Sequence, residues 1–177
     1  MQEIRELLVK EMRDLYDAEK QLVKALPKMV KASITTELSQ TFEHHLHETE
    51  GHVKRLEQAF ELLGEKPKGK PCAAMKGLIE EAQETIAEDM PDPLHDSAII
   101  YAAQKVEHYE MAGYGTLSAW ARSLGMEDVA RLLDATLQEE KKADEKLTGV
   151  GEELLSETSR PMGAARKESN GKRHRTA

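Results

Sequence analysis

Apolar residues recur at alternating intervals of three and four along most of the chain, which is the spacing of a buried helix face. This spacing predicts long helices over residues 2–32, 37–63, 96–124 and 127–155, and a shorter helix over 73–89. Pro27 should kink or interrupt the first helix, and Gly64 should end the second. Asp96 or Ser97 should cap the third long helix. The pattern therefore predicts an all-α protein built as a four-helix bundle.

The connection between the second and third long helices spans residues 64–95, and it holds the short predicted helix. Short links join antiparallel neighbours in a bundle, whereas a link of this length can cross it and join helices that run parallel. We therefore expect a long crossover that carries one additional short helix.

Two carboxylates interrupt the apolar stripe of the third long helix. Glu107 and Glu110 occupy positions between Ala103 and Tyr114, where apolar residues are expected. Burying an unpaired charge costs several kcal/mol. The stripe is therefore either misread, or a positive group lies beside these acids in the core.

The other long helices show the same interruption at their centres. Polar residues of metal-binding type fall on or beside the four stripes, and the full set is Glu19, His45, Glu48, His52, Glu107, Glu110, Glu140 and Asp144. Mid-helix positions lie at similar depth in an up-and-down bundle, so these side chains should converge. Taken singly, most of them would be read as solvated acids or ordinary core histidines. Taken together, they favour a site for two divalent metal ions, iron first, with manganese or zinc as alternatives.

Composition supports a helical protein, because 33% of residues are charged and only 4% are aromatic. No apolar run is long enough for a membrane span, and the first residues lack the apolar core of a signal peptide. The single cysteine, Cys72, excludes an internal disulfide framework, and we assign it no role. We expect a cytoplasmic protein.

Charge is uneven along the chain. Residues 158–177 hold six basic residues against one acid, while the whole chain carries a net charge of −8, so the remainder carries about −13. An acidic body argues against nucleic acid as the main partner and suits the attraction of cations. We expect a bundle domain over residues 1–156 and a basic, disordered tail over 157–177. The run KRHR at 172–175 supports at most weak, non-specific contact with nucleic acid.

Four separated blocks resemble the YciE/YciF family of bacterial ferritin-like proteins. They are residues 14–22 (DLYDAEKQL), 48–56 (ETEGHVKRL), 104–110 (QKVEHYE) and 139–147 (EEKKADEKL). The resemblance covers roughly residues 2–155 and implies a ferritin-like bundle with an additional crossover helix. It also implies similarity to di-iron proteins of the rubrerythrin type, an association with stress responses, and a homodimer.

The sequence departs from the wider ferritin-like pattern, which would place Glu-x-x-His on the second and fourth long helices. Thr49 stands three residues before His52, so Glu48 must reach the site from a different angle, with Glu50 as a less favoured competitor. Ala143 occupies the histidine place of the fourth helix.

Asp144 is the candidate substitute for that histidine, and His45 offers an additional nitrogen ligand. In this hypothesis Glu107 and Glu140 bridge the metals, while His52 binds one of them. Glu19 and Glu110 each bind terminally.

Three functions remain open at this stage. The leading hypothesis is a di-iron or iron–manganese protein that handles peroxide or dioxygen in an oxidative or general stress response. The second is a non-catalytic, dimeric stress protein whose metal is structural or vestigial. The third is iron storage, which requires a closed shell of many subunits.

Overall fold

The computed structural model describes residues 1–158, and all regular structure in this range is helical. The helices are α1 (Gln2–Ala32), α2 (Thr36–Leu62), α3 (Ala73–Ala87), α4 (Asp92–Ser123) and α5 (Glu127–Thr158). The predicted all-α fold is confirmed. Pro27 lies inside α1 and does not interrupt it, because the helix continues to Ala32. The predicted basic tail lies outside the described residues except for its first two positions.

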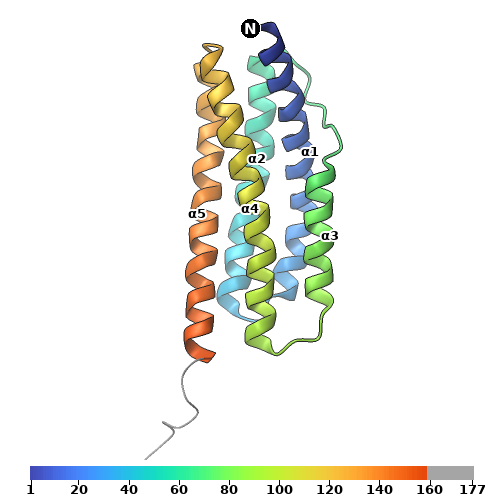
Figure 1. Ribbon diagram of the computed structural model, residues 1–177, viewed down its shortest axis with the longest axis vertical. Coiled ribbons are helices and arrows are strands. Elements are labelled where there is room, and N and C mark those ends of the chain that lie inside the picture. The colour runs from blue at the N-terminus through green and yellow to red at the C-terminus, as the bar shows by residue number, and fades with distance from the viewer. Residues whose placement is uncertain (159–177) are drawn as a thin grey trace, which may run out of the picture.

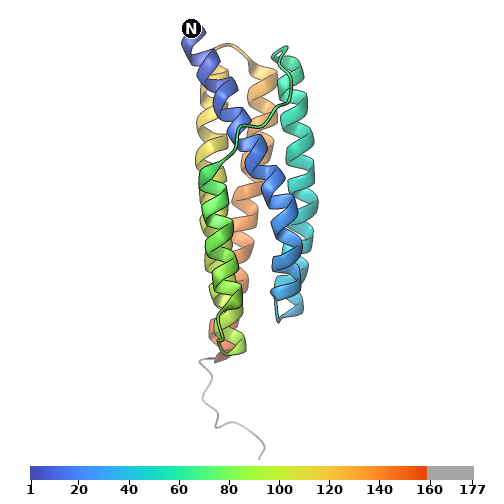
Figure 2. The same cartoon turned by 90° about the vertical axis from the view of Figure 1, so that its right-hand side faces the viewer.

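The four long helices form a bundle in which α1 packs on α2 and α4, and α5 packs on the same two helices (Figure 1). The helices α2 and α4 run in the same direction, as the long crossover predicts. The short helix α3 packs against α1 and α4 on the outside of the bundle (Figure 2). No helix of the described part of the chain is long and apolar enough to cross a membrane.

One backbone carbonyl and one side chain of α1 hold the crossover in place before α3 begins. The backbone N–H of Lys70 donates to the carbonyl of Arg13 at 2.9 Å, and that of Cys72 donates to Asp17 Oδ2 at 2.8 Å. Cys72 is buried and is the N-cap of α3, where its sulfur accepts a bond from the N–H of Met75. The crossover is therefore fixed along the outer surface of α1.

The start of α4 differs from the sequence prediction. The helix begins at Asp92 with Pro91 as its N-cap residue and Pro93 in the first turn, where a missing N–H costs nothing. Asp96 and Ser97 therefore both lie inside the helix, and the prediction that one of them caps α4 is wrong.

Asp96 instead holds the turn between α1 and α2. Its fully buried carboxylate accepts bonds from the backbone N–H groups of Ile34 and Thr35 at 2.9 and 2.8 Å, and from the Thr35 hydroxyl at 2.7 Å. A carboxylate can replace the missing helical partners of such N–H groups. One buried acid thus ties the first pair of helices to the second.

Two apolar clusters fill the bundle on either side of its centre. One includes Leu8, Leu56, Leu117 and Leu133, and the other includes Leu22, Phe42, Ile99 and Leu147. Each fully buried side chain of this size contributes about 1.5–3 kcal/mol. Stability therefore comes from both ends of the bundle, and the layer between them can hold polar residues.

We predict that Asp96→Ala lowers the free energy of unfolding by about 3 kcal/mol, because it leaves buried donors without an acceptor. Urea denaturation followed by circular dichroism measures the change. The matched control is Asp92→Ala, an exposed acid in the first turn of the same helix, with an expected loss of about 0.5 kcal/mol. Equal losses in the two variants would contradict the role of Asp96.

Candidate metal centre

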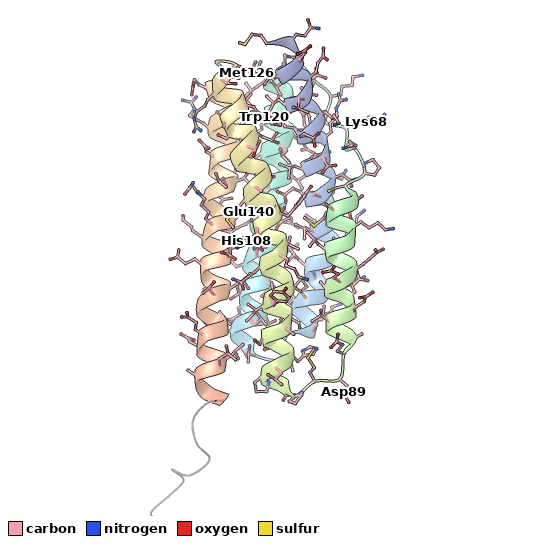
Figure 3. All side chains as sticks on the ribbon, in the orientation of Figure 1. Lys68, Asp89, His108, Trp120, Met126 and Glu140 are labelled. Atoms are coloured by element: carbon pink, nitrogen blue, oxygen red, sulfur yellow. The ribbon has the colours of Figure 1, made fainter. Side chains whose placement is uncertain are left out.

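Six polar side chains from the four long helices meet in the layer between the apolar clusters. None is more than 4% exposed, and they are Glu19, His45, His52, Glu107, Glu110 and Glu140. Figure 3 places Glu140 about half-way along the bundle. In the sequence each of these residues falls on the apolar stripe of its helix. The helix period therefore directs its side chain toward the core.

The six side chains form two overlapping groups. His45, Glu107, Glu110 and Glu140 make up one, and Glu19, His52 and Glu140 make up the other. Within each group the potential ligand atoms lie within 4.8 Å of one another. Glu140 belongs to both groups, so its carboxylate lies between two potential ion positions.

The separations between ligand atoms suit ions at both positions. His52 Nδ1 lies 2.9 Å from Glu140 Oε1 and 3.5 Å from Glu19 Oε1. His45 Nε2 lies 3.3 Å from Glu107 Oε1 and 3.8 Å from Glu140 Oε2. Metal–ligand bonds near 2.1 Å give ligand separations of about 3.0–3.4 Å at right or tetrahedral angles. The donor set therefore fits small divalent cations.

Several of these atoms have no hydrogen-bond partner among the described residues. They include both oxygens of Glu110, both of Glu140, one each of Glu19 and Glu107, and Nδ1 of His52. The 2.9 Å contact between His52 and Glu140 lacks the alignment of a hydrogen bond, so it satisfies neither atom. Buried polar atoms are almost always paired in native proteins. A set of unpaired lone pairs that faces one centre is typical of ligands to a cation.

The two histidines respond to this negative charge. Burial lowers the pKa of His52, but the Glu140 and Glu19 carboxylates outweigh burial and raise it to about 11. Burial likewise lowers the pKa of His45, and Glu107 leads the interactions that raise it to about 9. In the metal-free protein the imidazoles thus serve as cations beside the acids.

The pKa values of the buried acids are shifted in different directions. Burial, reinforced by the neighbouring carboxylates, raises the pKa of Glu107 and of Glu110 well above the usual range. Burial also raises the pKa of Glu140, but contact with His52 outweighs it, and the net shift is downward. Without metal, the site balances its charge with protons on some carboxyl groups and on the imidazoles.

Comparison with known proteins agrees with this architecture. Residues 3–159 match the family described as a domain of unknown function, DUF892. The chain belongs to this family. It is 47% identical to protein YciF of Escherichia coli K12 over 151 residues, which are 85% of this chain and 91% of that protein.

Solved structures of similar proteins share the fold of this DUF892 protein. The E. coli stress protein YciF superposes with a TM-score of 0.85 at 44% identity, over 88% of this chain and 99% of that chain. YcfI, a putative structural protein of Rhodopseudomonas palustris, gives 0.80 at 48% identity, over 82% and 92% of the two chains.

A two-domain protein of Anabaena variabilis, with DJ-1/ThiJ/PfpI-like and ferritin-like domains, covers 96% of this chain and 41% of its own at a TM-score of 0.56. Its identity of 15% shows the fold alone. Together these structures place this DUF892 chain among ferritin-like helical bundles.

Two residues that the sequence predicts as ligands, Glu48 and Asp144, lie outside both groups. Glu48 is partly exposed and contacts the far nitrogen of His45, with Oε2 at 3.4 Å from Nδ1. Asp144 accepts a bond from Gln104 at 3.1 Å and lies 3.4 Å from the exposed His108. Glu48 therefore adjoins the site through His45, and Asp144 faces the edge of α4.

The positions that depart from the wider pattern have local roles. Thr49 is fully buried, and its hydroxyl donates to the carbonyl of His45 at 2.8 Å, within its own helix. Ala143 is 9% exposed and borders a groove beside His45. Glu50 is exposed and pairs with His47 at 3.7 Å, away from the two groups.

An outer layer orients the ligand candidates, and sequence reasoning missed its main member. Glu139 Oε2 lies 2.9 Å from Nε2 of His52, on the side of the ring opposite Glu140. Arg55 donates to both oxygens of Glu139 at 3.0 Å. A carboxylate behind a histidine fixes its ring and strengthens it as a ligand. The only sequence signal was that Glu139 directly precedes Glu140 in a block shared with relatives.

Two tyrosines also contact acids near the site. Tyr114 is fully buried and donates a short hydrogen bond to Oε1 of Glu19. Tyr16 donates to Glu57 at 2.7 Å, on the outer side of the same region. Both tyrosines are buried, so each combines packing with a hydrogen bond. Tyr114 thus holds one ligand candidate from across the bundle.

We predict that Glu110→Gln stabilises the metal-free protein by about 2 kcal/mol at pH 7, because it removes a buried carboxyl group that must either keep its proton above its ordinary pKa or carry an unpaired charge. The native pKa of Glu110 is raised, so the folded state binds more protons than the unfolded state, and stability is lost as pH rises above the ordinary value of 4.5. The advantage of the variant should therefore shrink as pH falls toward 4.5.

Urea denaturation in the presence of a chelator, at several pH values, measures this difference. The control is Glu145→Gln, an exposed acid on α5, with no expected change. A destabilised Glu110→Gln protein would show that this carboxyl is satisfied in the native state.

Proposed function

We propose that this protein is a di-metal carboxylate protein that binds two iron ions, or one iron and one manganese, and acts on peroxide or dioxygen. The observation that carries the proposal is the convergence of four buried carboxylates and two imidazoles, in which most of the carboxylate oxygens and Nδ1 of His52 have no other partner among the described residues. Two divalent ions would supply four positive charges against four carboxylates. Oxygen-rich ligand sets with histidine favour iron or manganese, with zinc as an alternative occupant.

Each residue has a role in this proposal. Glu140, which is common to both groups, would hold both ions, and Glu107, a member of the first group, would be the second shared ligand. Glu110 binds at the position of His45, and Glu19 binds at the position of His52. Redox-active ions supply electrons for the reduction of peroxide or dioxygen when bound. Burial among the apolar clusters keeps bulk water away from this chemistry.

The two proposed ion positions differ in the groups that contact their ligands. Tyr114 supports Glu19, and Glu139 supports His52 with the help of Arg55. On the other side, Glu48 contacts His45. Glu48 and Asp144, which the sequence proposed as ligands, act in this scheme as outer groups rather than as members of either set.

The biological setting follows from the relatives. The E. coli relative is described as a stress protein, which supports a role in an oxidative or general stress response. The R. palustris relative is described as a putative structural protein, which favours the alternative of a non-catalytic protein with a structural metal. We further propose a cytoplasmic homodimer. Sizing by light scattering tests this state, and a small oligomer excludes a storage cage.

Anaerobic titration with ferrous iron should reach two ions per chain in the full-length protein. Glu107→Ala should lose at least one of them, because it removes a bridging carboxylate. The exposed Glu145→Ala variant should retain both. Binding well below two ions, unchanged by Glu107→Ala, would overturn the proposal.

Peroxide consumption separates the two functions. The iron-loaded protein should consume peroxide faster than the same concentration of free iron. Full iron binding with no consumption above free iron would select the non-catalytic alternative.

Glu139→Gln should weaken metal affinity by about 10–100-fold, because the carboxylate behind His52 orients that ring. Competition with a calibrated chelator measures the affinity. Glu145→Gln, on the same helix, is the control and should retain the wild-type value. An unchanged affinity in Glu139→Gln would show that Glu139 does not position His52 as a ligand.

A further inference from the structure

A groove of about 450 Å³ lies between α2 and α5 beside the buried site. Its walls include Glu37, His44, Glu48, Ala143 and Lys146, and His45 also lines it. His45 is therefore common to the groove and to the first ligand group. Four other surface grooves of the described residues are lined by none of the six buried site residues.

A continuous series of ligand atoms runs from this groove into the core. His44 Nε2 lies 3.4 Å from Glu48 Oε1, and Glu48 Oε2 lies 3.4 Å from His45 Nδ1. The opposite nitrogen of His45 lies 3.3 Å from Glu107 Oε1. Side-chain exposure falls along the series from 77% for His44 to 23%, 6% and 3% for the next three residues.

The small side chain of Ala143 keeps the groove open at its inner end. It is 9% exposed and lies one turn from Glu139 and one residue from Lys142. A larger residue at this position would project into the space beside His45 and Glu48, because all three line the same groove.

We propose that this groove is the passage through which divalent cations reach the buried site, with Glu48 as the outer binding position. The inference rests on the proposed function and adds the route of loading. A cation would bind first between His44 and Glu48. It would then displace the proton of the His45 imidazolium, which leaves to solvent through the groove, and pass that ring to reach the Glu107 carboxylate. Each step exchanges one nitrogen or oxygen ligand for the next at similar spacing, so the ion is never left without protein ligands.

Two lysines add positive charge to a passage whose walls also hold Glu37, His44 and Glu48. Lys146 is neutralised by Glu37, whose Oε1 lies 2.6 Å from its Nζ. Lys142 also lines the groove, whereas its neighbour Lys141 does not. A positive charge beside the passage opposes the approach of a cation, and a negative charge should favour it.

The test is the rate at which full-length, metal-free protein takes up Co²⁺, followed by stopped-flow absorbance of the bound ion under anaerobic conditions. Lys142→Glu should increase the second-order rate constant by about threefold or more at low ionic strength, and salt should reduce the increase. Lys141→Glu changes the net charge of the protein equally and should leave the rate close to that of wild type. Both variants should bind the wild-type number of ions at equilibrium.

A steric pair of variants tests the same passage independently. Ala143→Leu should slow uptake without changing the final stoichiometry, because it fills the inner end of the groove. Ala135→Leu is the same substitution at an exposed position of α5 and should not slow uptake. If Ala143→Leu does not fold, the lysine pair still decides the question.

The outcomes distinguish a failure of the proposed passage from a failure of the proposed metal site. Equal rate increases in Lys142→Glu and Lys141→Glu would show that general charge, rather than this groove, governs uptake, and would overturn the inference. Wild-type rates in both Lys142→Glu and Ala143→Leu would also overturn it, while leaving the di-metal proposal intact. Failure of the wild-type protein to bind Co²⁺ or Fe²⁺ at equilibrium would overturn the proposed function and the passage together.

Discussion

The mutual repulsion of four carboxylates in a dry helical core is the constraint on which the rest of this structure depends. Glu19, Glu107, Glu110 and Glu140 are each at most 2% exposed, so water cannot screen them. Protons and two imidazoles reduce the repulsion in the metal-free state, as the raised pKa values of Glu107 and Glu110 indicate. Even so, many of their oxygens remain without partners. An arrangement this costly is stable only because other parts of the bundle compensate.

That compensation is divided between the two ends of the bundle. Apolar clusters above and below the polar layer bury leucine, phenylalanine and isoleucine side chains from all four long helices. The Asp96 carboxylate adds a polar tie between the two helical pairs at one end. The helices are therefore positioned by contacts outside the site. Because packing is supplied elsewhere, the side chains at the centre of the bundle can serve as ligands.

Much of this arrangement could be predicted from the sequence, since a helix turns by a fixed angle per residue. The period of the apolar stripe placed Glu107 and Glu110 inward, and the same reasoning brought Glu19, His45, His52 and Glu140 to their level. Periodicity could not show that Glu48 lies outside both ligand groups, because the approach of one side chain to another depends on helix rotation and separation. It also could not reveal that Asp96 caps a turn 61 residues earlier in the chain, or that Glu139 supports His52 across the bundle. Such contacts join helices that only tertiary packing brings together.

The sharing of ligands between the two helical pairs has a consequence for folding. Each ligand group draws residues from both sides of the long crossover, so neither helical hairpin holds a complete group by itself. A bound ion would act as a cross-link between the halves, and would bind only after they had docked. Ligands that bind the native state alone add about 2.7 kcal/mol at a hundredfold excess over the dissociation constant. Metal supply would thus add to the stability of the docked bundle, and without metal only the apolar clusters and the Asp96 contacts would hold the two halves together.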